Sequence, residues 1–150
     1  MALQTSAGIL LSLVEGAPAT YDAAGFGALT LVDVGDIESI GEFGGTSQIN
    51  NFTGLTDIVV QKFKGAFDAG SFGLGLGQDR SDAGQALLVA AAVPTNNAVQ
   101  SVSVTFTNGD IAYFTCIISS YTTNISDVNS IVKSTAQIEL NNLVVFVAAV

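Results

Sequence analysis

The carboxylates that lie closest together along the chain are the first candidates for chemistry. They are Asp33, Asp36, Glu38 and Glu42. Such side chains could hold a divalent cation or, as a pair, act as general acid and base. Their spacing lacks the Asp-x-Asp-x-Asp-Gly pattern of a calcium loop, and strand alternation places Asp36 and Glu38 on one face with Asp33 on the other. A solvated strand face therefore explains the cluster better than a metal site.

A glycine-rich segment, Gly73-Leu-Gly75-Leu-Gly77, lies between a predicted strand and a predicted helix, where a dinucleotide-binding fingerprint would sit. The third glycine of that fingerprint is missing, because Gln78 or Arg80 stands in its place, and no second βα unit follows. We interpret these glycines instead as positions that allow a helix to approach closely or the sheet to curve strongly.

Residue types exclude most other chemistry. The chain has no histidine and one cysteine, so Ser-His-Asp and Cys-His catalysis, zinc fingers, iron–sulfur clusters and intrachain disulfides are excluded. Cys116 lies in an apolar run and is predicted to be a buried core thiol. We therefore expect no catalytic residue, no metal and no cofactor.

Charge is scarce and unevenly distributed. The chain has 13 acidic and 4 basic residues, a net charge of −9, and four bases are too few for a patch that binds nucleic acid. Residues 1–61 hold seven acids and no base, which predicts a concentrated negative potential on one part of the fold. Lys62 and Lys64 share a strand face and fit either a solvated edge or an ion pair between subunits.

The composition indicates a protein that assembles. Hydrophobic residues make up 49% and charged residues 11%, against roughly 25% charged in typical soluble domains. Large exposed apolar patches usually mark interfaces. The longest apolar runs, Ala86–Val93 and Leu143–Val150, are shorter than the ~20 residues that span a bilayer. No basic residue precedes Ala7–Val14, which makes it a poor signal peptide, so we expect a soluble, intracellular protein without membrane contact.

Hydrophobic periodicity predicts a mainly β protein that forms a single domain over residues 1–150. One helix is predicted at about 80–93, because Ser81-Asp82 can open it and Pro94 ends it. The predicted strands cover 5–14, 28–40, 57–63, 65–77, 98–107, 110–121 and 130–140. Asn108-Gly109 predicts a tight hairpin between two of them. The fold class is a β-sandwich or half-barrel with one flanking helix and a long loop or hairpin at about 41–64, and residues 15–25 are a predicted loop.

Several short motifs follow one another in a particular order, from about Thr20 to Leu140. They are Thr20-Tyr-Asp-Ala-Ala-Gly-Phe26, Val34-Gly-Asp-Ile-Glu-Ser-Ile-Gly-Glu-Phe-Gly-Gly45, Val60-Gln-Lys-Phe-Lys-Gly65, Asp82-Ala-Gly-Gln-Ala-Leu-Leu88, and a run from Val104 through Asn108-Gly109 to Tyr113-Phe-Thr115, followed by Ser120-Tyr-Thr-Thr-Asn124. Their order and spacing resemble the tail tube (major tail) proteins of long-tailed bacteriophages, in a superfamily that includes type VI secretion tubes.

The resemblance implies a structural protein and not an enzyme. It implies hexameric rings, in which inner strands join into one barrel, and stacking of these rings into a tube for DNA ejection. The implied partners are further copies of the chain, a tape measure protein inside the tube, and tail terminator and distal tail proteins at its ends. DNA would pass through without being bound. The implied location is the virion tail, after assembly in the host bacterial cytoplasm.

Three sets of residues are predicted to serve assembly. An inter-ring stacking loop within Gly41–Thr56 would use Gly44, Gly45, Gln48, Asn50, Asn51, Phe52 and Leu55. An N-terminal arm, residues 1–15, would contact a neighbouring subunit through Ile9, Leu11 and Leu13. The tube lumen would be lined by Asp36 and Glu38, with Glu42 near its rim, and by Ser101, Ser103 and Thr105.

For two further segments the sequence leaves more than one role open. The polar face of Lys133, Thr135, Gln137 and Glu139 suits the lumen less well, because of its lysine, unless Glu139 or a neighbour offsets that charge. The apolar C-terminal segment, residues 143–150, could be an edge strand or a second arm.

Two rival functions come from other classes. A β-sandwich binding module, such as a carbohydrate-binding or virion-decoration domain, is disfavoured because the chain has no tryptophan and only three tyrosines for stacking on sugars. An enzyme without histidine would need a pair of carboxylates in a cleft.

Overall fold

The computed structural model describes residues 3–149, so Met1, Ala2 and Val150 at the ends of the predicted arm and C-terminal segment lie outside the described residues. The strands are β1 (Leu10–Glu15), β2 (Val32–Asp33), β3 (Ile37–Ile40), β4 (Thr46–Phe52), β5 (Gln61–Asp68), β6 (Ser71–Gly77), β7 (Gln100–Thr105), β8 (Ile111–Asn124), β9 (Lys133–Leu140) and β10 (Val145–Val147). The helices are α1 (Ala23–Gly27) and α2 (Ala83–Ala91). This confirms the mainly β class with a flanking helix.

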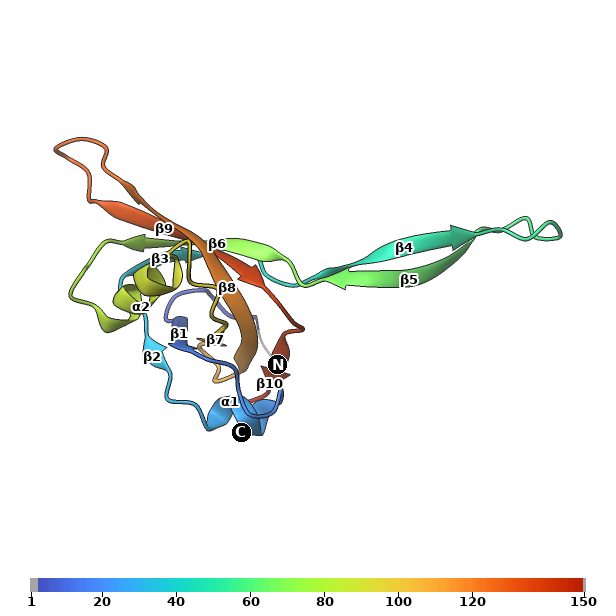
Figure 1. Ribbon diagram of the computed structural model, residues 1–150, viewed down its shortest axis with the longest axis horizontal. Helices are drawn as coiled ribbons and strands as arrows, with labels where there is room; N and C mark the ends of the chain where they lie inside the picture. The colour runs from blue at the N-terminus through green and yellow to red at the C-terminus, as the bar shows by residue number, and fades with distance from the viewer. Residues whose placement is uncertain (1–2, 150) are drawn as a thin grey trace.

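Eight strands form one antiparallel sheet in the order β2-β1-β7-β8-β9-β6-β3, with β10 paired to β8 (Figure 1). Leu11 of β1 and Leu74 of β6 belong to the same buried core although four strand steps separate their strands. The sheet must therefore curl around its own apolar face, as in a half-barrel. β4 and β5 form a separate two-stranded ribbon.

Three of the predicted strands and their turn are confirmed. Segments 98–107, 110–121 and 130–140 contain β7, β8 and β9. The Asn108-Gly109 turn closes the β7–β8 hairpin, where the N–H of Gly109 donates to the carbonyl of Phe106 at 3.0 Å. Gly109 has φ +96°, a left-handed conformation in which a side chain would be strained.

Helix α2 lies within the predicted range and packs on the core next to β1, β2 and β8. The carboxylate of Asp82 caps it by accepting from the N–H of Gln85 at 3.0 Å. The helix ends at Ala91, three residues before Pro94. Leu88 is buried in the core, while Val89 on the next position is exposed.

Two predicted segments are corrected by the structure. The predicted loop at 15–25 contains the start of α1, which is too short to show helical periodicity and is recognisable only by its Asp22 cap and buried Phe26. The predicted strand at 65–77 is two strands, because the chain turns at Gly70, which has φ +91°. The ribbon thus begins and ends beside the main sheet.

The prediction of an N-terminal arm is wrong for two of its three contact residues. Leu11 and Leu13 are 0% exposed, and β1 pairs with both β2 and β7 inside the subunit's own sheet. Ile9 is half-buried against the same core. An alternating apolar strand looks the same whether it completes its own core or a neighbour's, so the sequence could not separate these cases. The C-terminal segment supplies a short strand, β10, to the same sheet.

Candidate assembly surfaces

The β4–β5 hairpin projects from the body as a long ribbon and carries the predicted stacking residues (Figure 1). Gly44 and Gly45 lie at its base, Gln48, Asn50, Asn51 and Phe52 lie on β4, and Leu55 lies in its tip. Every residue of β5 is exposed, and so is every residue of β4 except Ser47. The ribbon therefore has almost no packing partner among residues 3–149, and two-stranded ribbons without packing partners are marginally stable in water.

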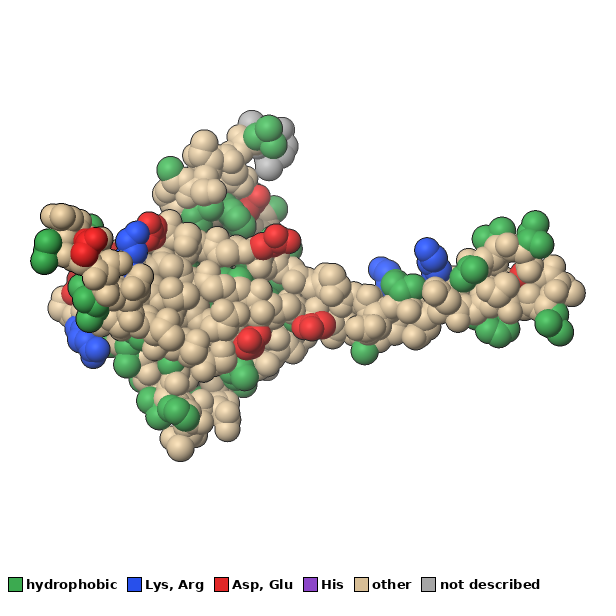
Figure 2. Space-filling model, turned by 90° about the horizontal axis from the view of Figure 1, so that it is seen from above, with side chains coloured by type: hydrophobic (Ala, Val, Ile, Leu, Met, Phe, Trp, Pro, Cys, Tyr) green, Lys and Arg blue, Asp and Glu red, His purple; other side chains and the backbone are tan. Residues whose placement is uncertain are grey.

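The ribbon has two chemically different faces, set by the pairs Ile49–Lys64, Asn50–Phe63, Asn51–Lys62 and Phe52–Gln61. Directly paired residues share a face. One face is therefore basic, with Lys62 and Lys64, and the other is aromatic, with Phe52 and Phe63. Figure 2 shows the lysines along the shaft and hydrophobic side chains at the tip.

The hairpin tip adds two apolar residues, Ile58 and Val59, that the sequence-based site did not include. Both are highly exposed there, as is the predicted stacking residue Leu55. The run Ile58-Val59-Val60 belongs to the predicted strand 57–63, whereas the observed strand β5 begins only at Gln61. The apolar character of this run was the signal that could have identified it as part of the site, since an exposed apolar run at the end of a hairpin can form a contact with another molecule.

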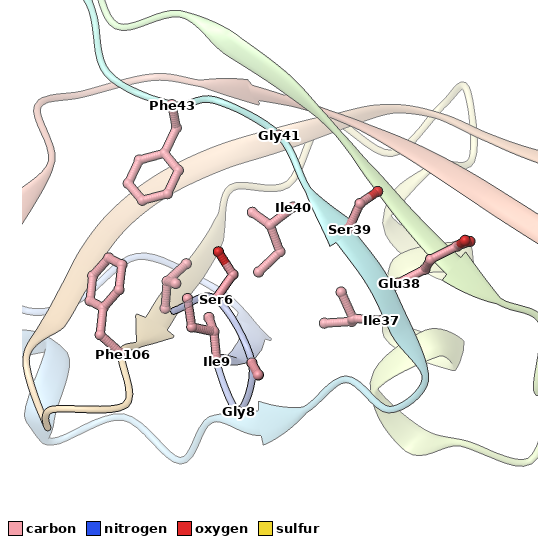
Figure 3. Close-up of a pocket in the computed structure, with 12 residues that line it drawn as sticks. Ser6, Gly8, Ile9, Ile37, Glu38, Ser39, Ile40, Gly41, Phe43 and Phe106 are labelled. Carbon is pink, nitrogen blue, oxygen red and sulfur yellow. The ribbon is translucent and has the colours of Figure 1, made fainter. Parts of the chain in front are cut away.

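A cavity of about 620 Å³ with a mixed polar and apolar lining opens at the seam of the curled sheet. It lies between β3 on one side and the segment before β1 with the end of β7 on the other. Figure 3 shows Phe43 and Phe106 facing each other across it, with Ile9, Ile37 and Ile40 directed toward its interior. Glu38 and Ser39 also line the cavity but point away from its centre. We call this space the seam cavity.

A polar surface covers the outward face of β6, β9 and the end of β8; we call it the outer sheet face. Its members come from strand positions that alternate with core residues: Gly73, Gly75 and Gly77 of β6, Lys133, Thr135, Gln137 and Glu139 of β9, and Ser120, Thr122 and Asn124 of β8. The glycines thus lie on the outward face, while α2 packs mainly against β1, β2 and β8 and reaches β6 through the Gln85–Gly77 hydrogen bond.

Glu38 joins the outer sheet face through an ion pair. Lys133 Nζ lies 2.9 Å from Glu38 Oε1. Among residues 3–149 the structure contains no other ion pair. Both side chains are about half exposed. The positive charge of Lys133, which made the β9 face less suitable for a lumen, is therefore offset by the negative charge of Glu38.

Two of the predicted lumen residues are buried in the subunit, which corrects that assignment. Ser101 is 0% and Ser103 is 5% exposed, while Thr105 is half-buried. Ser103 pairs with Tyr113, and the ring of Phe26 from α1 stacks on Tyr113 with centroids 5.0 Å apart. The hydroxyl of Ser101 donates to the carbonyl of Gly16 at 2.6 Å. This polar strand face is covered by the α1 segment and cannot line a water-filled bore.

The other predicted lumen acids lie next to the seam cavity. Asp36 and Glu42 are exposed and flank the residues of β3 and Gly41 that line it. Asp36 has φ +60°, a left-handed conformation that aspartate tolerates better than most residues. No group of three or more potential metal-ligating side chains occurs among the described residues.

Cys116 is 0% exposed, and burial raises the pKa of its thiol to about 12. Such a thiol is inert at neutral pH. No helix in the described part of the chain has the length and apolar character needed to span a bilayer.

Comparisons with known proteins give matches in structure only. No family model matches the sequence, and no curated protein matches it significantly. The fold is similar to a chain of the anti-feeding prophage baseplate, with a TM-score of 0.72, 9% identity, and coverage of 99% of this chain and 97% of the other.

Two further structures extend this similarity. A chain in the virion of a native gene transfer agent particle matches with a TM-score of 0.68, 12% identity, and coverage of 97% and 100% of the two chains. The SPP1 tail tube matches with a TM-score of 0.64, 15% identity, and coverage of 91% and 75%. The curled sheet, the flanking helix and the projecting hairpin of this chain together have the fold of tail tube proteins.

Proposed function

We propose that this protein is the subunit of a tail tube, in which hexameric rings stack into a conduit for DNA. The observation that carries the proposal is the projecting hairpin, whose apolar and basic side chains are exposed and are not covered by any part of the chain that the structure describes. The fold shared with tail and injection-system structures supports the same role. A monomer would gain little from such an element, whereas a polymer can bury it between copies.

The hairpin is the proposed inter-ring element. Its predicted stacking residues all lie on the ribbon, at its base or in its tip, so the whole element can reach beyond the body of the subunit (Figure 1). The other proposed partners are a tape measure protein within the tube and terminator and distal tail proteins at its ends. The proposed location is the virion tail, with assembly in the host bacterial cytoplasm.

The outer sheet face is the proposed lumen lining. It is polar except for the half-buried Ile117, which pairs with Glu139, and it is balanced in charge near Glu38 and Lys133. Glu139 adds a further negative charge to each subunit on this face. Negative charge repeated around a ring would repel DNA phosphates and let the genome pass without binding.

Electron microscopy of the purified full-length protein tests the proposal. We expect negatively stained samples to show rings or tubes as the concentration rises. A variant in which residues 46–68 are replaced by a two-residue turn should keep the sheet and its cooperative unfolding but form no tubes. Tubes of normal length from this variant would contradict the stacking role, and a wild-type protein that stays monomeric at all concentrations would contradict the tail tube function.

A further inference from the structure

The hairpin tip and the seam cavity are complementary in chemistry and lie in separate places. The tip exposes Leu55, Ile58 and Val59, and isoleucine and phenylalanine side chains form the apolar part of the cavity wall. Ser6, Glu38 and Ser39 form much of the polar remainder. A volume of about 620 Å³ is enough to accept several side chains, because ligand pockets span roughly 300–1,000 Å³. Figure 1 shows the ribbon pointing away from the body, so a chain cannot fill its own cavity with its own tip.

Charge supplies a second match between these two surfaces. Eleven of the 13 acids lie outside residues 46–68, together with only two of the four bases, so the body carries the whole net charge of −9. The ribbon is neutral overall, and Lys62 and Lys64 lie together on one of its faces. Neither lysine has an ion-pair partner among the described residues.

The acids beside the seam cavity are placed to receive these lysines. Glu42 lies between two cavity-lining residues, Gly41 and Phe43, and its side chain is exposed. Glu38 is already paired with Lys133 and points away from the cavity (Figure 3). Lys62 and Lys64 follow Val59 by three and five residues, about 10–17 Å along a strand. A tip seated in the cavity would therefore leave both lysines near its acidic rim.

From these matches we propose that the hairpin tip of one subunit inserts into the seam cavity of another copy of this chain, with Lys62 and Lys64 against Glu42. This inference rests on the proposed tube function and names the surface that receives the stacking element. The contact joins two different surfaces, so it is head-to-tail, and repeated head-to-tail contacts generate rings or open polymers.

Disulfide trapping tests the contact directly. The double variant Ile58→Cys/Ile40→Cys places one thiol in the tip and one in the cavity. After assembly and mild oxidation we expect a ladder of covalent multimers on a non-reducing gel. The buried thiol of Cys116, with a pKa of about 12, should not contribute to crosslinking.

A matched control uses the other exposed hairpin of the subunit. Val128 in the β8–β9 loop is 98% exposed and apolar, as Ile58 is. The pair Ile58→Cys/Val128→Cys should stay monomeric on the same gel, as should each single variant. A ladder from the control pair without one from the cavity pair would overturn the docking.

Charge exchange gives an independent readout if the cysteine variants assemble poorly. Lys62→Glu/Lys64→Glu should raise the concentration needed for assembly by roughly tenfold or more, and adding Glu42→Lys should recover a large part of that loss. Failure of the exchange to recover assembly, or wild-type tubes whose cavity pair never crosslinks, overturns this docking alone. A wild-type chain that forms no polymer overturns the tube function as well.

Discussion

At the scale of single residues, Gln85 joins three parts of the fold. Its side chain is 1% exposed, and its amide nitrogen donates to the carbonyls of Gly35 at 3.0 Å and Gly77 at 2.9 Å. Its amide oxygen accepts from the N–H of Asp79 at 2.9 Å. The side chain thus ties α2 to the loop before β3 and to the end of β6, which positions the wall of the seam cavity.

Replacing Gln85 by alanine should destabilise the subunit. Three partly buried backbone groups would lose their partner, and we expect the free energy of unfolding to fall by about 2–4 kcal/mol. Urea denaturation followed by circular dichroism measures this. Gln48→Ala on the exposed ribbon is the matched control and should change stability by less than about 0.5 kcal/mol; equal effects of the two substitutions would contradict the bridging role.

Two hydrogen-bonded carboxylates, the Asp22 cap of α1 and Asp79 in the turn before α2, predict how stability depends on pH. Hydrogen bonds from the Gly25 N–H and the Thr20 hydroxyl lower the pKa of Asp22 below its ordinary value of about 3.8. The hydroxyl and backbone N–H of Ser81 likewise lower the pKa of Asp79. A lowered pKa in the folded state means that these bonds stabilise above the unfolded value and are lost as pH falls through the folded pKa.

We therefore expect the free energy of unfolding to decline as pH is lowered below about 4, and the decline to be shallower in Asp22→Asn/Asp79→Asn. Denaturation midpoints measured from about pH 5 to pH 2 test this. Asp36→Asn/Asp57→Asn removes the same two charges at exposed positions and is the control. Parallel curves for Asp22→Asn/Asp79→Asn and the wild type would show that the hydrogen bonds to these two carboxylates do not contribute to stability.

At the scale of elements, β1 belongs to the subunit's own core and not to an arm. Leu11 and Leu13 face the core beneath α2, and β1 hydrogen-bonds to strands on both sides. The ribbon β4–β5 is the opposite case, an element with regular pairing but almost no burial. Removal of the first should affect folding, and removal of the second should affect assembly.

Alanine substitutions at two neighbouring leucines, Leu10 and Leu11, test whether β1 serves folding or assembly. Leu11→Ala should lower the free energy of unfolding by about 2–5 kcal/mol, because it leaves a cavity in a packed core. Leu10→Ala, at a position 49% exposed, should change it by less than about 0.5 kcal/mol. Thermal unfolding of both variants is the measurement. A folded, stable Leu11→Ala variant that only fails to polymerise would restore the arm interpretation.

At the scale of the whole molecule, charge is divided between a negative body and a neutral ribbon with a basic face. Figure 2 shows acidic side chains over the body and lysines on the ribbon. This division favours contacts of ribbon against body over contacts of body against body, because like charges repel. Repetition of the subunit would multiply any charge on the lumen face.

Reversing one lumen charge should therefore make the tube retain DNA. In the assembled state Glu139→Lys should bind single-stranded oligonucleotides, with an affinity that falls steeply as salt rises, and should protect them from nuclease. Co-sedimentation with and without nuclease measures both effects. Glu15→Lys makes the same charge change at an exposed position on β1, and oligonucleotide bound there should stay nuclease-sensitive. Equal protection by both variants would contradict the lumen assignment.

The sequence by itself determined the local features of this protein. Alternating residues predicted β7 and β9, a strand apolar on both faces predicted β8, Asn108-Gly109 predicted the tight turn between β7 and β8, and Asp82 marked the start of α2. These features depend on neighbours within a few residues, which is the range over which periodicity, turn chemistry and capping act. The mainly β class and its flanking helix follow from them.

Only the tertiary structure decided which surface each strand face meets. Ser101 and Ser103 alternate with valines much as Thr135 and Gln137 alternate with alanine and isoleucine, yet the first pair is buried beside α1 and the second lies on the outer sheet face. Leu11 and Leu13 likewise could have faced a neighbour and face their own core instead. Alternation shows that a strand has two different faces, but what covers each face depends on packing between segments far apart in the chain.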